Sequence, residues 1–212
     1  MKESSHIGYA RYNMNYGIYA KIAIDNYTIA KELFTDLNKN QFIVMAADKD
    51  STLEEKSIIA VVFSAMALES FFNDYAAWRL GDDLYYNTFD RLGVLEKFEL
   101  IISVILKKDL DKSKSYYYRL KELIKHRNEL VHNKSYSYNE NVKIECIDKY
   151  IDDEYINVES TSKVLFNSAK NAVNAICEIA SFFDEVDSDF KAKFRLLGLQ
   201  TNYSPETIKK IL

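Results

Sequence analysis

The spacing of apolar residues predicts α-helices through most of the chain. Apolar side chains recur at intervals of three and four residues in five stretches, at about 9–37, 51–78, 90–108, 115–132 and 159–186. This interval places them on one face of a helix. The chain has only five Gly and one Pro, so the residues that separate the short strands of β-rich proteins are nearly absent. The pattern predicts an all-α fold, an up-and-down bundle of four to five helices.

Capping and turn residues give the expected limits of the second helix. Ser51 and Glu54 have the spacing of a capping box and directly precede an apolar run, so the helix is expected to begin at Ser51. Gly81 and the two Asp residues after it are expected to end it.

Two stretches depart from the helical pattern. Residues 133–157 are rich in Tyr, Asn and Asp, and a weak alternation within them is compatible with a short β-hairpin. Residues 188–212 predict one or two short helices around Gly198 and Pro205. We therefore expect a helical domain at 1–187 with an irregular insertion at about 133–157, followed by a small C-terminal appendage of short helices.

Composition narrows the class of protein. Cys146 and Cys177 are 31 residues apart in a chain without a secretory leader, which favours two reduced thiols and a cytoplasmic location. The longest apolar stretch, 58–68, is well short of the roughly 20 residues that a membrane helix needs. It is expected to be a buried core helix, and no membrane association is predicted.

Charge is unevenly distributed along the chain. The formal net charge is -4, which predicts no general attraction to polyanions. Residues 105–135, however, hold nine Lys or Arg against four Asp or Glu, a local balance of +5. A charge run of this kind is more often a solvated helix face than a binding surface.

Two charged residues occupy positions where the helical pattern calls for apolar side chains. Arg127 lies in the middle of an apolar stripe formed by Leu120, Leu123, Ile124, Leu130 and Val131. Glu69 likewise interrupts a stripe formed by Ile58, Val62, Ala65, Phe72 and Ala76. An isolated buried charge is costly, so we expect the two helices to pack side by side with Glu69 near Arg127. A purely structural ion pair is the alternative.

His132 and Asn128 make this region chemically more specific. Asn128 precedes His132 by four residues and therefore shares its helix face. A single His at a helix C-terminus is commonly only a favourable charge on the helix dipole, so His132 gains weight from its neighbours. His6 and His126 have no metal-ligand spacing to Cys or carboxylates, and no phosphate-binding Gly loop occurs. The sequence therefore predicts neither a metal nor a cofactor.

The chain resembles the HEPN superfamily, whose hallmark is an Arg followed by a polar residue and a His near the end of a long helix in a small bundle. The matching residues are Arg127, Asn128 and His132, and the segment 65–73 around Glu69 is similar to the family's earlier helix, where an acidic residue often sits. The likeness covers about 57–179. It implies a helical bundle, usually a homodimer with two Arg and His sets meeting at the interface.

The resemblance also implies a function. Many HEPN proteins are metal-independent endoribonucleases of toxin-antitoxin, abortive-infection or other antiviral systems, and others bind nucleotides or partner proteins without catalysis. On the ribonuclease hypothesis His132 transfers protons and Arg127 holds the scissile phosphate. Asn128 fixes His132 or the phosphate, and Glu69 orients Arg127.

Three hypotheses follow. The first is a HEPN ribonuclease of a prokaryotic toxin or defence system, with Lys121, Lys125 and Lys134 as candidate RNA contacts and the tyrosines at 116–118 as stacking candidates that are more often packing residues. The second is a non-catalytic HEPN module that binds a nucleotide or a partner such as an antitoxin or nucleotidyltransferase. The third is a helical interaction protein in which Glu69 and Arg127 merely pair.

Overall fold

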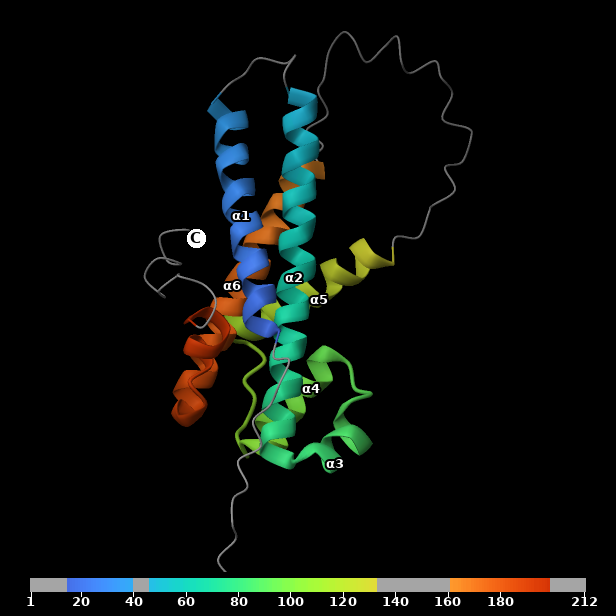
Figure 1. The fold of residues 1–212 in the computed structure, drawn as a ribbon, viewed down its shortest axis with the longest axis vertical. Helices are drawn as coiled ribbons and strands as arrows, with labels where there is room; N and C mark the ends of the chain where they lie inside the picture. The colour runs from blue at the N-terminus through green and yellow to red at the C-terminus, as the bar shows by residue number, and fades with distance from the viewer. Residues whose placement is uncertain (1–14, 40–45, 133–160, 199–212) are drawn as a thin grey trace, which may run out of the picture.

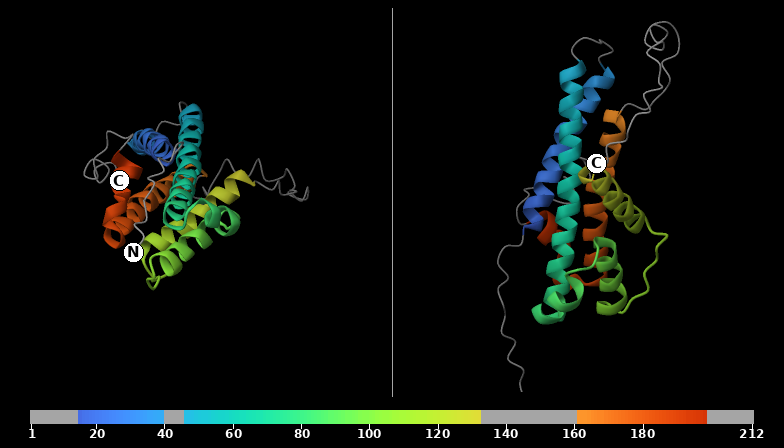
Figure 2. Two further views of the ribbon diagram at one scale, coloured as in Figure 1. Left: turned by 60° about the horizontal axis from the view of Figure 1, so that its bottom comes forward. Right: turned by 90° about the vertical axis from the view of Figure 1, so that its right-hand side faces the viewer.

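The computed structural model describes residues 15–39, 46–132 and 161–198, and this part of the chain contains helices and no strand. Three long helices, α1 (Tyr16–Lys39), α2 (Ala46–Leu80) and α6 (Thr161–Val186), run side by side, and α5 (Ser115–Val131) crosses them at an angle (Figures 1 and 2). The all-α bundle expected from the sequence is confirmed. The expected β-hairpin and insertion at 133–157 lie outside the described residues.

Short helical segments complete the structure. Between α2 and α5 lie α3 (Asp82–Leu84), the π-helical turn η2 (Tyr85–Phe89), α4 (Val94–Leu100) and the π-helical turn η3 (Ile101–Ile105). The 3-10 turn η5 (Ser188–Phe190) and the π-helical turn η6 (Phe194–Gly198) follow α6.

The predicted start of the second helix is wrong. α2 begins at Ala46, so Ser51 and Glu54 lie inside the helix and form no cap. Ala46 and Ala47 favour helix, and no Gly or Pro stands between them and Ser51, so the helix continues through this point. Glu54 instead accepts a hydrogen bond of 3.0 Å from the Ser162 hydroxyl and links α2 to the start of α6.

α2 ends as expected, but the α-helix after it is shorter than the stretch of 90–108 that the apolar pattern predicts. Gly81 has φ 82°, a backbone conformation that favours glycine, and its N–H donates 2.9 Å to the Ala77 carbonyl. The helix expected at about 90–108 begins only at Val94. Gly93 is its N-cap, and the Gly93 N–H donates 2.8 Å to the Glu96 carboxylate, so the helix starts where this bond satisfies its first free amide.

Aromatic side chains form the centre of the core. Phe71 and Tyr75 of α2 pack against Phe183 of α6 with ring centroids 5.0 and 4.9 Å apart, and Phe190 of η5 lies 4.7 Å from the Tyr75 ring. The domain boundary after residue 187 stays a prediction. In the described residues, Phe190 belongs to the same hydrophobic core as the bundle.

α2 is the central helix, because it contacts α1, α4, α5 and α6. Its segment Ser51–Leu80 is also long and apolar enough to cross a membrane by length and composition alone, although half of its most apolar window is buried inside the structure. The core helix of a bundle meets the same criteria. This property therefore bears little on where the protein resides.

Candidate functional site

The N-terminal half of α5 is firmly packed. Leu120 and Leu123 are fully buried, and the Tyr116 ring lies 4.5 Å from that of Phe182 on α6. The Tyr117 hydroxyl donates 2.6 Å to the carboxylate of Glu99 on α4. These contacts fix the direction in which the helix leaves the bundle.

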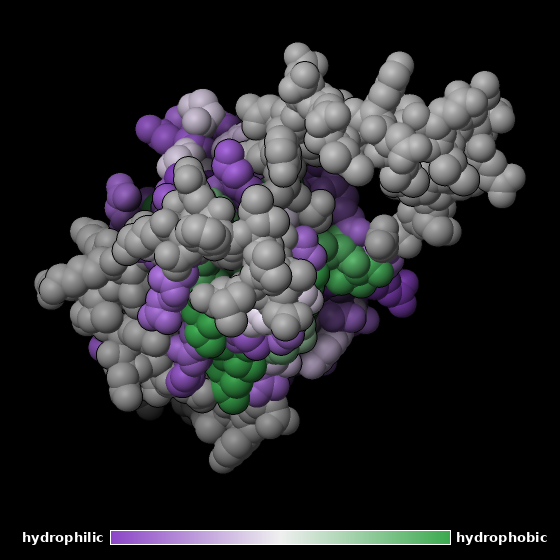
Figure 3. All heavy atoms as spheres, turned by 90° about the horizontal axis from the view of Figure 1, so that it is seen from above, coloured by the Kyte–Doolittle hydropathy of each residue, from purple (hydrophilic) through white to green (hydrophobic). Residues whose placement is uncertain are grey.

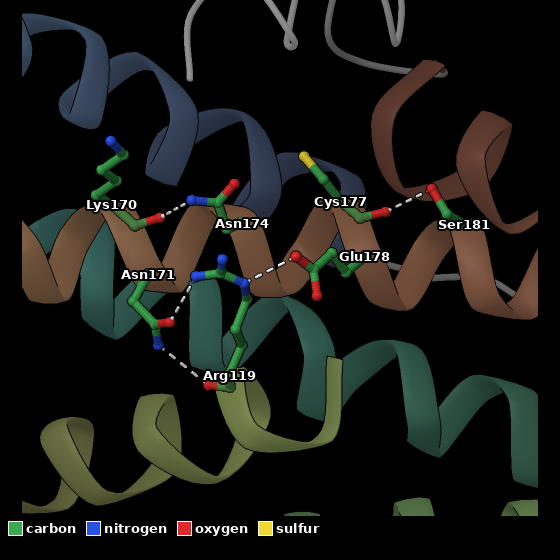
Figure 4. Close-up of polar contacts among 7 residues, drawn as sticks. All are labelled: Arg119, Lys170, Asn171, Asn174, Cys177, Glu178 and Ser181. Carbon is green, nitrogen blue, oxygen red and sulfur yellow. Dashed lines mark hydrogen bonds and ion pairs between the residues drawn. The ribbon is translucent and has the colours of Figure 1, made fainter. Parts of the chain in front are cut away.

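Arg119 joins this half of α5 to α6 (Figure 4). Its Nε donates 2.8 Å to the Glu178 carboxylate, and its Nη1 donates 3.0 Å to the side-chain oxygen of Asn171. Asn171 in turn donates 3.2 Å to the Arg119 carbonyl. Arg119 is one of the nine basic residues of the segment 105–135. In the structure its guanidinium bonds to α6.

The C-terminal half of α5 projects from the bundle (Figures 1 and 2). Leu130 is only half-buried, Val131 is 53% exposed, and His132 is exposed. The apolar stripe that the sequence predicts through Val131 therefore loses its partners before it ends, because the helix extends past the side of α2. In a view from above, apolar patches on the surface are separated by hydrophilic side chains (Figure 3).

Arg127 lies at this transition and meets Glu69, as the sequence predicts. Its Nη2 is 3.7 Å from a Glu69 carboxylate oxygen, and the two side chains are 30% and 36% exposed. Its Nη1 donates 3.0 Å to the side-chain oxygen of Asn128. The pair joins α5 to α2, but the guanidinium is half-exposed rather than buried. One carboxylate and one amide hold it while part of it stays open to solvent.

His132 forms the C-cap of α5, and its backbone N–H donates 2.9 Å to the Asn128 carbonyl. Its side chain is exposed. The Asn128 side chain contacts Arg127 and makes no hydrogen bond with His132 in the part of the chain that the structure describes. Because His132 comes five residues after Arg127, the two side chains leave the helix about 140° apart. The motif is therefore intact but divided between two faces of α5.

Two interactions close to Glu69 could not be predicted from the sequence pattern: the one between Glu69 and Tyr85, and the one between Asn73 and Lys97. Burial, and then the negative charge of Asp90, raise the pKa of the Tyr85 hydroxyl, and Glu69 adds a smaller effect. One turn after Glu69, Asn73 accepts 2.8 Å from the buried ammonium of Lys97. The apolar pattern alone places neither contact, because both depend on how residues 82–105 fold back against α2.

The remaining candidates separate into two groups. Lys121 and Lys125 are exposed, as RNA contacts need to be, whereas Lys134 lies outside the described residues. Of the three tyrosines, Tyr116 and Tyr117 are packing residues, and Tyr118 is 61% exposed. Within the described ranges, no group of three His, Cys, Asp or Glu side chains is arranged to hold a metal ion.

Comparison of the chain with protein-family models, curated proteins and solved structures found no match.

Proposed function

We propose that this chain is a metal-independent endoribonuclease of HEPN type, acting in the cytoplasm as a prokaryotic toxin or antiviral effector. One observation carries the proposal. The half-exposed Arg127 guanidinium is held between Glu69 and Asn128, on the helix whose exposed end bears His132. A cation for the phosphate and a solvent-accessible imidazole for proton transfer are the minimum that cleavage by the 2′-hydroxyl of RNA requires.

Each residue has a defined role in this mechanism. Arg127 binds the scissile phosphate and stabilises the charge that develops on it. The 2′-oxygen loses its proton as it forms a bond to phosphorus, and the bond from phosphorus to the 5′-oxygen breaks as that oxygen takes up a proton. His132 transfers one of these protons, for which its exposed side chain is suited. Glu69 and Asn128 hold the guanidinium from two sides and limit the orientations it adopts. They are positioning residues, because they act through Arg127.

The separation of Arg127 and His132 on α5 favours a site shared by two copies of the chain. Side chains about 140° apart on one helix do not converge on one phosphate unless the helix end rearranges. In the homodimer that the resemblance implies, Arg127 of one copy would face His132 of the other. The partly exposed apolar residues Leu130 and Val131 lie beside the motif and would be covered by such an interface.

The alternative is a non-catalytic HEPN module that binds a nucleotide or a partner protein, such as an antitoxin or nucleotidyltransferase. The pairing of Arg127 with Glu69 partly neutralises the cation and favours the partner-protein form of this alternative, because a nucleotide phosphate would have to compete with that carboxylate.

The decisive experiment incubates purified protein with labelled RNA in EDTA. We expect cleavage by the wild type and loss of cleavage, by at least about 100-fold, in His132→Ala. His126→Ala is the matched control, because His126 is a half-buried histidine of the same helix whose imidazole lies 3.9 Å from Glu122. No cleavage by the wild type, or equal cleavage by His132→Ala, would remove the ribonuclease proposal and favour the binding module.

A complementation assay tests the shared site. Arg127→Ala and His132→Ala are each expected to be inactive, and a mixture of the two should regain up to about a quarter of wild-type activity if each heterodimer contains one intact set. Light scattering should give a dimer mass at micromolar concentration. A monomer mass together with full wild-type activity would reject the shared site without affecting the assignment of the residues.

A further inference from the structure

The solvent-facing side of α5 carries a continuous row of side chains that ends at His132. Its members are exposed and recur at intervals of three or four residues: Lys114, Tyr118, Lys121, Lys125, Asn128 and His132. At about 100° per residue they lie within an arc of about 80° on the helix surface. We call this row the α5 strip. From Tyr118 to His132 it is about 21 Å long.

The charges of the α5 strip are largely free for a ligand. Lys121 and Lys125 are exposed and form no ion pair with any other described residue. Lys114 lies 3.8 Å from the exposed Asp111, a contact that solvent weakens. The strip itself contains no carboxylate, although Glu129 borders it near His132. Arg119 and Arg127 point to other helices and do not belong to it.

Tyr118 supplies an aromatic surface in the same row. Its two neighbours are occupied, since Tyr116 packs on Phe182 and Tyr117 bonds to Glu99. The Tyr118 side chain is 61% exposed and forms no ring contact within the described residues. A solvent-exposed ring flanked by lysines one turn away is the combination that single-stranded nucleic acids use, with bases stacked on the ring and phosphates on the cations.

We infer that the α5 strip is a binding track for single-stranded RNA, which it leads toward His132. The inference rests on the proposed function for the identity of the ligand. The Tyr118 ring stacks on a base, and Lys121 and Lys125 contact phosphates between that base and the motif. A single strand fits better than a duplex, because the row is one helix wide and a base must be unpaired to stack on Tyr118.

The test measures binding separately from cleavage. A fluorescent, fully 2′-O-methylated single strand of about 20 nucleotides cannot react through its 2′-oxygens, and fluorescence anisotropy reports its binding to the full chain. Tyr118→Ala should weaken binding about 10-fold. Lys121→Ala with Lys125→Ala should weaken it at least about 10-fold and reduce the salt dependence by about 1.4 in the slope of log K against log salt.

Two control variants lie off the strip. Lys170→Ala removes an exposed lysine of α6, and Tyr86→Ala removes a tyrosine that is 64% exposed in η2. Both should bind as the wild type does. A duplex of the same sequence should bind more weakly and should be insensitive to Tyr118→Ala.

The possible results separate the inference from the proposed function. If the wild type does not bind the strand, or if the strip variants bind as tightly as the wild type, the track is rejected. Binding that depends on the strip, without cleavage of unmodified RNA, supports the track and rejects the ribonuclease. Cleavage of unmodified RNA that does not change in the strip variants supports the ribonuclease and rejects the track.

Discussion

Arg119 and Arg127 lie about two turns apart on α5, and each faces a glutamate of a neighbouring helix. Arg119 has its Nε 2.8 Å from Glu178 and two further hydrogen bonds with Asn171. Arg127 stands 3.7 Å from Glu69, and its one hydrogen bond to a described residue goes to Asn128. The Arg119 guanidinium makes two short side-chain contacts to α6, whereas the Arg127 guanidinium makes one hydrogen bond, within its own helix, and one longer ion pair. The two arginines are therefore similarly exposed, but Arg119 is held more firmly than Arg127.

The largest effect is expected from Arg127→Ala on catalysis. If the proposed ribonuclease mechanism holds, removal of the Arg127 cation should reduce RNA cleavage by about 100-fold or more. The half-exposed pair with Glu69 should contribute less than about 1 kcal/mol to stability. Cleavage kinetics and urea denaturation of the same preparation measure the two effects. Strong destabilisation with unchanged cleavage per folded molecule would reverse the roles assigned to the two arginines.

Arg119→Ala should show the opposite behaviour. It removes the cation from the Glu178 carboxylate, one oxygen of which is buried without a hydrogen-bond partner among the described residues. We expect a loss of about 2 kcal/mol in the free energy of unfolding, measured in urea. Cleavage per folded molecule should stay within about threefold of wild type at low temperature, because no atom of Arg119 reaches the motif. Glu178→Gln, which keeps the shape of the side chain, should lose less.

Double-mutant cycles sharpen the comparison to single pairs. The coupling between Arg119 and Glu178 should be about 1 to 2 kcal/mol, because the contact is short and supported by Asn171. The coupling between Arg127 and Glu69 should be at most about 0.5 kcal/mol in stability. In cleavage, however, Glu69→Gln should have an effect only when Arg127 is present. Additive effects of these two substitutions on cleavage would show that Glu69 does not act through Arg127.

The smallest effect of a substitution is expected in the reactivity of Cys177, which precedes Glu178 on α6 (Figure 4). Burial, and then the charge of Glu178, raise the pKa of the Cys177 thiol from 9.0 to about 12. At pH 8.5 the folded thiol is therefore protonated, and its alkylation should be on the order of 100-fold slower than in the unfolded chain. Because the fold favours the neutral thiol, burial of Cys177 makes its full contribution to the free energy of unfolding below pH 9. This contribution is lost as the pH rises toward 12.

This thiol reports on the Arg119 contacts when Cys146 is replaced by Ser. Arg119→Ala should accelerate native-state alkylation about fivefold by easing local opening between α5 and α6, whereas Arg127→Ala should leave the rate unchanged. Mass spectrometry at pH 8.5 measures both rates. Equal acceleration by the two substitutions would show that α5 is released as a unit and that its two halves do not differ.

The sequence alone determined the helical class, the limits of α5, the end of α2 at Gly81 and the meeting of Glu69 with Arg127. The first three follow from apolar periodicity and from the scarcity of Gly and Pro. The fourth was read from two opposite charges, each on the apolar stripe of its helix. The incorrect start of α2 at Ser51 has a different cause. A capping-box spacing also occurs inside helices, and only the contact of Glu54 with Ser162 shows what this glutamate does.

The tertiary structure decided which polar residues of α5 stay exposed to solvent and which bond to other helices. In sequence, Arg119 is one more member of a basic run and Tyr118 one of three equivalent tyrosines. Packing of α5 against α4 and α6 commits Arg119, Tyr116 and Tyr117, and the projection of the helix end past α2 leaves Arg127 half-exposed and His132 exposed. Periodicity defines the faces of a helix, but the neighbouring helices determine how far along each face burial extends, and their positions depend on contacts distant in sequence.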